Sequence, residues 1–104
     1  MRVQHFSLDK LIDAYENSDY IEYSQLFSKD VRKILTKSVF LAGNKKIKYD
    51  LGKYISREYL GFLKENEMTV FLWKAQFTKT QNDVLVRLTL SKQNGKNMVM
   101  GFYY

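Results

Sequence analysis

The chain contains no cysteine and no proline, and it has a single histidine, His5, among its 104 residues. Without cysteine it can form no disulfide, no thiolate metal site and no cysteine nucleophile. A metal site built on one histidine would need several neighbouring carboxylates, and the acidic residues are scattered along the chain. We therefore predict no metal site and no cofactor. The lack of disulfides fits a reducing compartment.

Long apolar runs are absent as well. The N-terminal stretch MRVQHFSLDK has no continuous apolar segment, and no run elsewhere approaches the roughly 20 residues that a membrane-spanning helix needs. Repeats, low-complexity segments and linkers are also missing. These absences predict one cytoplasmic domain that covers residues 1–104 and has no membrane association.

The charge is predominantly basic. Lysine and arginine total 17 and aspartate and glutamate total 11, so the formal net charge is +6. Such a charge favours anionic partners and fast encounter with them, but it says nothing about the fold. Because the lysines are spread along the chain, a solubilising surface is the simpler interpretation.

The clearest pattern lies in the last third of the chain, where three runs alternate apolar and polar residues. They predict three consecutive antiparallel strands, Thr69–Thr78, Asp83–Lys92 and Asn97–Tyr104. Asn94-Gly95 joins the second and third runs, and Asn-Gly is typical of a two-residue type I′ hairpin turn. A short polar link joins the first two runs.

The two turns also predict a register. The Asn94-Gly95 turn places Leu90 opposite Val99, and apolar matching in the first hairpin places Trp73 opposite Leu88. Because side chains alternate with period two, one face is almost wholly apolar and must be covered. That face comprises Phe71, Trp73, Ala75, Phe77, Val84, Val86, Leu88, Leu90, Val99, Gly101 and Tyr103.

The other face of these strands is mixed, and it holds the most specific feature of the sequence. In the predicted register Lys74 lies directly opposite Arg87, and two such cations repel unless an anionic group lies nearby. Methionine, arginine and aromatic residues are enriched in the cores of protein interfaces. We therefore predict an interaction surface made of Leu72, Lys74, Leu85, Arg87, Met98, Met100, Phe102 and Tyr104. The alternative is that the two cations simply extend into solvent.

Two short helices are predicted before residue 30. Ser7 can cap a first helix, because the apolar residues from Leu8 to Tyr15 follow helical spacing. Asp19 with Glu22 three residues later forms a capping box for a second helix. Both helices are short and need the sheet for stability.

The segment from residue 31 to residue 63 is more ambiguous. Alternation over residues 31–41 favours a strand, and continuation of the second helix through Leu35 is the competing interpretation. In the preferred interpretation, a turn at residues 42–45 and a second alternating run at residues 46–50 complete a small hairpin. Residues 51–63 then follow helical spacing and predict a third helix.

This order of elements predicts an α+β fold in which helices pack on the concave face of a curved antiparallel sheet, as in a cone-shaped or cystatin-like roll. Two stretches, IDAYENSDY at residues 12–20 and QLFSKDV at residues 25–31, carry a further likeness that continues through residues 43–63. In these stretches the chain resembles the nuclear-transport-factor-2-like superfamily, which includes ketosteroid isomerase and SnoaL-type cyclases.

The resemblance implies a conical pocket between sheet and helices, and often a homodimer through the outer face of the sheet. It does not settle activity, because this fold includes enzymes, binding modules and scaffolds. The isomerase-type enzymes have a carboxylate base on the strand after the Asp-Val element, and the matching position here is Leu35. Their oxyanion-binding tyrosine falls near Leu11. Both departures argue against that chemistry, and no catalytic residue is predicted.

Six aromatic side chains are candidates for lining such a pocket. Tyrosine and tryptophan supply polar tips inside an apolar cavity, as a small-molecule site requires. The candidates are Tyr15, Tyr23, Tyr54, Tyr59, Trp73 and Tyr103. Plain core packing is the simpler role for each of them.

Three functional hypotheses follow. The first is a non-enzymatic binding or protein-interaction module that forms a homodimer through the mixed sheet face, or binds a protein with an acidic surface there. The second is an enzyme, or a carrier of a small apolar ligand, that uses the aromatic pocket. The third is single-stranded nucleic-acid binding, for which only Phe102 and Tyr104 would supply stacking rings on the mixed face.

Overall fold

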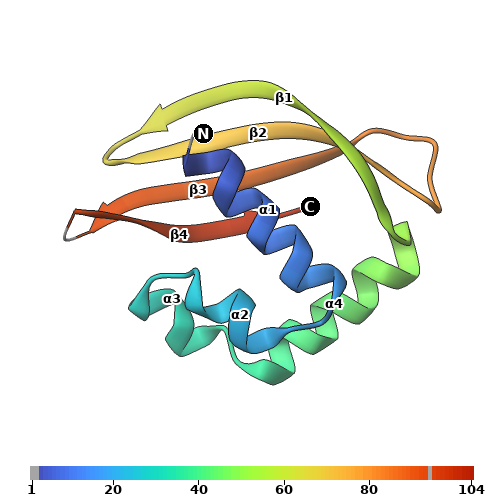
Figure 1. Cartoon of the computed structure of the whole chain (residues 1–104), viewed down its shortest axis with the longest axis horizontal. Coiled ribbons are helices and arrows are strands. Elements are labelled where there is room, and N and C mark those ends of the chain that lie inside the picture. The colour runs from blue at the N-terminus through green and yellow to red at the C-terminus, as the bar shows by residue number, and fades with distance from the viewer. Residues whose placement is uncertain (1–2, 94) are drawn as a thin grey trace.

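The structure, a computed structural model, describes residues 3–93 and 95–104, in which four helices are followed by four strands (Figure 1). The helices are α1 (Val3–Glu16), α2 (Tyr20–Gln25), α3 (Lys29–Ile34) and α4 (Lys37–Leu51). The strands are β1 (Tyr54–Glu65), β2 (Met68–Phe77), β3 (Val84–Gln93) and β4 (Lys96–Tyr103). They form one antiparallel sheet in the order β1-β2-β3-β4. The predicted α+β fold, with helices packed against a curved antiparallel sheet, is confirmed.

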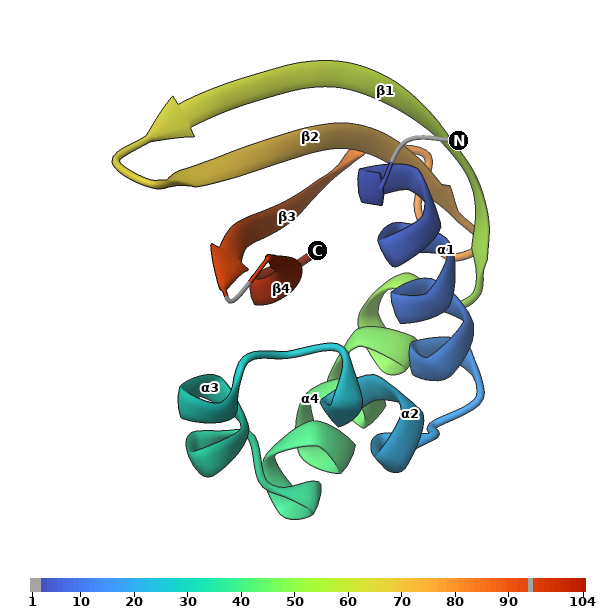
Figure 2. The ribbon, with the colours of Figure 1, turned by 60° about the vertical axis from the view of Figure 1, so that its left-hand side comes forward.

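The hydrophobic core lies between the sheet and the helices. Leu8 and Leu11 of α1 and Trp73 of β2 are completely buried. Figure 2 shows α1 against the concave side of the sheet, and α2, α3 and α4 gathered on the side of β4. No helix among the described residues has both the length and the apolar composition to cross a bilayer.

The predicted inner face of β2 and β3 is confirmed, but the register between these strands is shifted by two residues. Trp73 lies opposite Val86, and Phe71 lies opposite Leu88. A shift of two residues leaves every side chain on its predicted face, because side chains alternate with period two. The shift does separate the two cations that were predicted to face each other.

Lys74 and Arg87 therefore do not form the predicted pair. Lys74 lies opposite Leu85 on one side and opposite Glu58 of β1 on the other. Its amine is 3.6 Å from a carboxylate oxygen of Glu58, so this cation has an acidic neighbour within the chain. Arg87 lies opposite Leu72.

A β-bulge in β4 reverses the faces of the last residues. The second hairpin begins as predicted, with Leu90 opposite Val99 and with Gly95 at a positive φ of 78°, whereas Asn94 lies outside the described residues. Thr89 then lies opposite Gly101, so Met100 is an extra residue on β4. Because one inserted residue exchanges inside and outside, Phe102 turns toward the helices. The predicted placement of Phe102 and Tyr104 on the outer face is wrong.

The predicted strand over residues 31–41 and hairpin over residues 42–50 are also wrong, because this region forms α3 and α4. Thr36 caps α4 by accepting a hydrogen bond from the Val39 N–H at 3.2 Å. A buried asparagine, Asn44, occupies the core-facing position one turn after Phe40 and interrupts the apolar stripe. This polar residue makes the helical spacing difficult to recognise in the sequence.

Asn44 is held by two hydrogen bonds that join α4 to the end of α1. Its side-chain amide donates to the Tyr15 carbonyl at 2.6 Å, and its Oδ1 accepts from the Ser18 hydroxyl at 2.9 Å. Gly52 then ends α4 at a positive φ of 80°, where an added Cβ would come within 2.2 Å of the Thr78 Oγ1. Only glycine fits this junction between helix and strand.

The predicted third helix is the strand β1, and two bulges in it explain the error. The register with β2 shifts between Tyr54 and Ser56, and again between Tyr59 and Gly61. Each extra residue stretches the period-two alternation locally, so the apolar residues acquire a spacing that resembles that of a helix.

At the N-terminus, α1 begins at Val3, so the predicted cap at Ser7 is wrong. The predicted cap of the second helix is confirmed, because the Asp19 carboxylate accepts a hydrogen bond from the Glu22 N–H at 3.2 Å.

Candidate functional site

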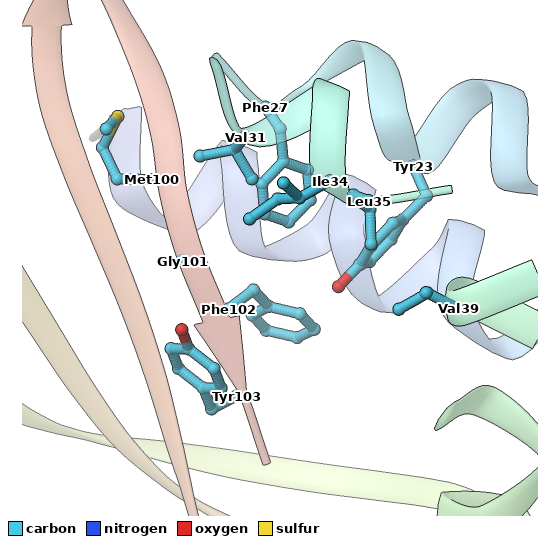
Figure 3. A pocket seen from close by; sticks show the side chains of 10 residues that line it. All are labelled: Tyr23, Phe27, Val31, Ile34, Leu35, Val39, Met100, Gly101, Phe102 and Tyr103. Carbon is cyan, nitrogen blue, oxygen red and sulfur yellow. The ribbon is translucent and has the colours of Figure 1, made fainter. Parts of the chain in front are cut away.

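Two adjoining hollows lie between β4 and the helices, and we call them together the β4 groove. The first, of about 200 Å³, separates α3 from β4, and its lining includes Val31, Ile34, Leu35, Val39, Met100 and Gly101 (Figure 3). The second, of about 260 Å³, separates α4 from β4, and its lining includes Tyr15, Gly43, Lys46, Ile47 and Tyr104. Tyr23, Phe102 and Tyr103 line both hollows, so the two adjoin each other.

One wall of the β4 groove is a single face of α4. Val39 borders the first hollow, and Gly43 and Ile47 border the second. These three residues are spaced four apart, so they form one stripe along the helix. Gly43 carries no side chain there, which leaves room between α4 and the strand.

The opposite wall is β4, the edge strand of the sheet. Part of this edge is already paired, because the Ser28 N–H donates to the Val99 carbonyl at 3.0 Å and the Val99 N–H donates to the Leu26 carbonyl at 3.1 Å. Within the described part of the chain, no strand or isolated bridge pairs with Gly101–Tyr103 on the side away from β3. The strand edge that ends at Tyr103 therefore runs alongside the groove.

Aromatic rings form the floor of the groove. The ring centroids of Tyr15 and Tyr23 are 5.6 Å apart, and those of Tyr23 and Phe102 are 6.2 Å apart. Tyr104 continues the cluster, with its ring 5.2 Å from Tyr15 and 5.1 Å from Phe77 of β2. Such ring pairs contribute about 0.5–1.5 kcal/mol each beyond the area they bury. The cluster holds β4 to the helical layer.

The hydroxyl groups of this cluster stay protonated at neutral pH. Burial raises the pKa of Tyr15 to about 12. Burial also raises the pKa of Tyr23, and the neighbouring Tyr15 and Tyr103 add to the shift. Burial, followed by the charge of Glu16, raises the pKa of Tyr104 in the same direction. The groove floor is thus neutral.

The rim of the groove exposes large apolar side chains. Ile34 is 75% exposed, Val39 is 56% exposed and Tyr103 is 60% exposed. Figure 3 shows Val31, Ile34 and Leu35 on the opposite side of the first hollow from Phe102 and Tyr103. Exposed apolar residues that gather around a concave site, rather than occurring singly, are typical of interaction surfaces.

Tyr103 shapes the open end of the groove. Its ring lies over Gly101, where an added Cβ would come within 3.0 Å of the ring. The guanidinium carbon of Arg87 lies 6.0 Å from the centroid of the same ring. A side chain at residue 101 would therefore require the Tyr103 ring to shift by a few tenths of an ångström.

Ionisable groups are few in the lining of the β4 groove. Among the described residues that line the two hollows, the ionisable groups are tyrosine hydroxyls and the Lys46 amine. General acid–base catalysis at neutral pH uses groups whose pKa values lie near 7, most often histidine or a perturbed carboxylate. Neither type lines the groove in the part of the chain that the structure describes.

Of the six predicted pocket residues, the structure brings three together. Tyr15, Tyr23 and Tyr103 line the β4 groove. The other three lie elsewhere in the core: Tyr54 packs on Phe77, and Tyr59 packs on Trp73 with ring centroids 5.5 Å apart. A conical pocket lined by all six is therefore not what the fold builds.

The predicted interaction surface is divided between two places. Leu72, Lys74, Leu85, Arg87 and Met98 share the outer face of the sheet, as their register positions show. Met100, Phe102 and Tyr104 instead line the β4 groove because of the bulge. Ile34 and Val39 were not singled out from the sequence. Both are large apolar residues close to lysines, Ile34 at the end of α3 and Val39 near the start of α4. This contrast is the signal that could have identified them.

A third hollow, of about 380 Å³, lies beside three lysines at the junction of α4 and β1. Two of these lysines bind carbonyl groups at helix ends. The Lys48 amine donates to the Glu16 carbonyl at 2.8 Å, and the Lys79 amine donates to the Tyr49 carbonyl at 3.1 Å. Cations are stabilising at the C-terminal ends of helices, so the structural role accounts for these residues.

Comparison with known proteins adds a fold and no activity. No family model and no curated protein matches this chain. Among solved structures, it is similar to the solution structure of a SEC-C motif containing protein from Rhodopseudomonas palustris. The two share a TM-score of 0.59 and 14% sequence identity, over 88% of this chain and 70% of the other. At this identity the likeness shows the fold alone.

The expected membership of the nuclear-transport-factor-2-like superfamily is wrong. The structural match is to a SEC-C motif protein. The hairpin and third helix on which the resemblance depended are absent, since residues 31–63 contain α3, α4 and part of β1. Leu35, which was matched to a catalytic strand position, is the C-cap of α3, and Leu11 is a core residue.

Proposed function

We propose that this chain is a non-enzymatic protein-interaction module and that the β4 groove is its binding site. The observation that carries the proposal is the set of exposed apolar side chains, Ile34, Val39 and Tyr103, around an apolar groove beside a sheet edge. Burying such side chains is favourable by about 25 cal/mol for each Å² removed from water. A partner that covers them therefore gains free energy.

The dimensions of the groove favour a polypeptide over a small molecule. Pockets for small ligands have volumes of about 300–1,000 Å³. The two hollows, at about 200 and 260 Å³, are each smaller, and they lie side by side along β4. An extended polypeptide suits this shape, because it can place one side chain in each hollow and pair its backbone with the strand edge.

A matched pair of substitutions tests the proposal. Ile34→Glu changes a residue that lines the first hollow, and Ile21→Glu changes an equally accessible residue of α2, 69% exposed, that does not line it. Peptides selected from a randomised display library on the wild-type chain should lose at least about tenfold in affinity for the Ile34→Glu variant. They should keep their affinity for the Ile21→Glu variant. Equal binding to both variants would refute the groove as the site.

The outer face of the sheet supports a second candidate function, formation of a homodimer. Leu85 is 49% exposed there and lies diagonally across from Leu72, and Leu63 of β1, 54% exposed, lies on the same face. Because Lys74 is close to Glu58, much of the charge on this face is balanced within the chain. Two copies can therefore meet without two lysines repelling each other.

Light scattering after size-exclusion chromatography measures this second candidate directly. A dimer is expected at high micromolar concentration, and Leu85→Glu should convert it to a monomer. A wild-type monomer at that concentration would remove the candidate, without affecting the proposal for the β4 groove.

A cytoplasmic location is a further part of the proposal, and it is supported by the lack of cysteine.

A further inference from the structure

The positive charge of the chain is concentrated in the helices that form the wall of the β4 groove. Residues 29–51, which contain α3 and α4, carry a formal net charge of +5, because seven cations outnumber two anions. Residues 1–28, which contain α1 and α2, carry a net charge of −3. The helical layer is therefore electrically divided, and its basic half supplies one wall of the β4 groove.

One of these cations, Lys46, lines the second hollow directly. Arg32 and Lys37 belong to α3 and α4, which supply Val31, Ile34 and Val39 to the first hollow, but they do not line it themselves. The two basic helices thus supply part of the wall of the groove.

The acidic residues of the chain neutralise the cations of α3 and α4 only weakly. Lys46 is 3.4 Å from Asp50, and Lys33 is 3.8 Å from Asp30, and both pairs are well exposed to solvent. Exposed ion pairs of this kind contribute about 0–1 kcal/mol and are screened by salt. Most of the positive charge of α3 and α4 is therefore available to attract an anionic partner.

We propose that the β4 groove binds an extended polypeptide segment in which apolar residues alternate with, or are flanked by, aspartate and glutamate. This inference rests on the proposed function, and it names the chemistry of the partner. The apolar side chains enter the two hollows, and the carboxylates lie toward Lys46 and the net positive charge of α3 and α4. A second copy of this chain is disfavoured in the groove, because its own basic helices would face a basic wall.

In this proposal the partner's main chain also forms hydrogen bonds with the edge of β4, which is recognition by strand addition. From Gly101 to Tyr103, β4 is the edge of the sheet in the described part of the chain, and it runs beside the groove. A segment that pairs there places alternate side chains toward the helices and toward solvent. This alternation predicts a partner pattern of apolar residues at every second position.

The composition of peptides selected on the chain tests the inference. A randomised display library is selected on the wild-type chain and depleted on the Ile34→Glu variant, so that only groove-dependent peptides remain. We expect these peptides to alternate apolar residues with aspartate or glutamate, and their dissociation constants to rise with salt concentration. Groove-dependent peptides that are neutral or basic would overturn the inference and leave the proposed function standing. If no groove-dependent peptide remains, both fail.

Two charge reversals separate a local effect from general attraction to a basic protein. Lys46→Glu removes a cation that lines the groove, whereas Lys64→Glu changes an exposed residue of β1 at the far edge of the sheet. Both variants have the same net charge. We expect at least about tenfold weaker binding for Lys46→Glu and less than about twofold for Lys64→Glu. Equal losses would overturn the inference, as would a single-stranded oligonucleotide that displaces the peptides and requires Lys46.

Discussion

Tyr23 illustrates how single side chains maintain the neutral interior beside the groove. Its ring centroid lies 4.7 Å from that of Phe40 and 5.0 Å from that of Phe27, and its side chain is buried. The ionised form of a phenol buried in this way is strongly disfavoured, which is the reason that the pKa of Tyr23 is raised. The aromatic cluster is therefore stable only while its hydroxyl groups keep their protons.

This raised pKa predicts alkaline destabilisation with a definite sign. The pKa of an unfolded tyrosine is about 10. Above that pH the unfolded chain releases the proton of Tyr23 while the folded chain retains it, so the free energy of unfolding falls as the pH rises. The slope for one such group is about 1.4 kcal/mol per pH unit. Below pH 10 this contribution to stability is fully present.

Urea unfolding of wild type and of Tyr23→Phe between pH 8 and about pH 11 measures this effect. The variant should lose stability less steeply than wild type above pH 10, by about the slope of one group. Tyr49→Phe, at an exposed position, is the matched control and should follow the wild-type curve. Parallel curves for wild type and Tyr23→Phe would contradict the account of this residue.

The β-bulge in β4 is the feature that creates the groove. Without the extra residue at Met100, Phe102 would point away from the helices and Tyr103 toward them. With it, Phe102 joins the aromatic floor and Tyr103 is left at the exposed rim. One inserted residue thus decides which side chains hold the layers together and which can meet a partner.

Alanine substitutions at these two neighbouring positions test the bulge. Phe102→Ala removes a ring from the packed cluster, and it should lower the free energy of unfolding by about 2–4 kcal/mol. Tyr103→Ala removes a mostly exposed ring, and it should cost less than about 1 kcal/mol. Urea denaturation curves give both values. The opposite order would show that β4 follows the regular register without a bulge.

The last three strands were predictable because their alternation is regular over most of their length. The prediction placed the first of them at Thr69–Thr78, and the structure has β2 at Met68–Phe77. The errors occur where a bulge or a buried polar residue interrupts the regular spacing of apolar residues. Two bulges stretch β1, a bulge reverses the end of β4, and the buried Asn44 breaks the stripe of α4. None of these bulges, nor the buried asparagine, produces a regular spacing that can be recognised in the sequence.

The candidate site was only partly predictable for the same reason. Tyr15, Tyr23 and Tyr103 were predicted to line a pocket, and they line the groove. Phe102 and Tyr104 were predicted to lie on the outer face, and the bulge places them in the groove instead. The rim residues on α3 and α4 were missed because those helices were not recognised.

At the scale of the whole molecule, two packed regions hold the sheet and the helices together. The concave face of the sheet holds α1, and the aromatic cluster holds α2 and α4 to β4 (Figures 1 and 2). Among the surfaces that the described residues leave uncovered is an apolar groove between two basic helices and one strand edge. This combination is the basis of the proposal that the chain binds extended acidic and apolar polypeptide segments.

The most direct test of this central claim is an amide chemical-shift titration by NMR with a peptide selected on the wild-type chain. The account predicts that the largest shifts occur at Val31, Ile34 and Leu35 of α3, at Val39 of α4, and at Gly101 and Tyr103 of β4. Shifts confined to the outer sheet face, around Leu72 and Leu85, would contradict it, as would a peptide that causes no shift at β4.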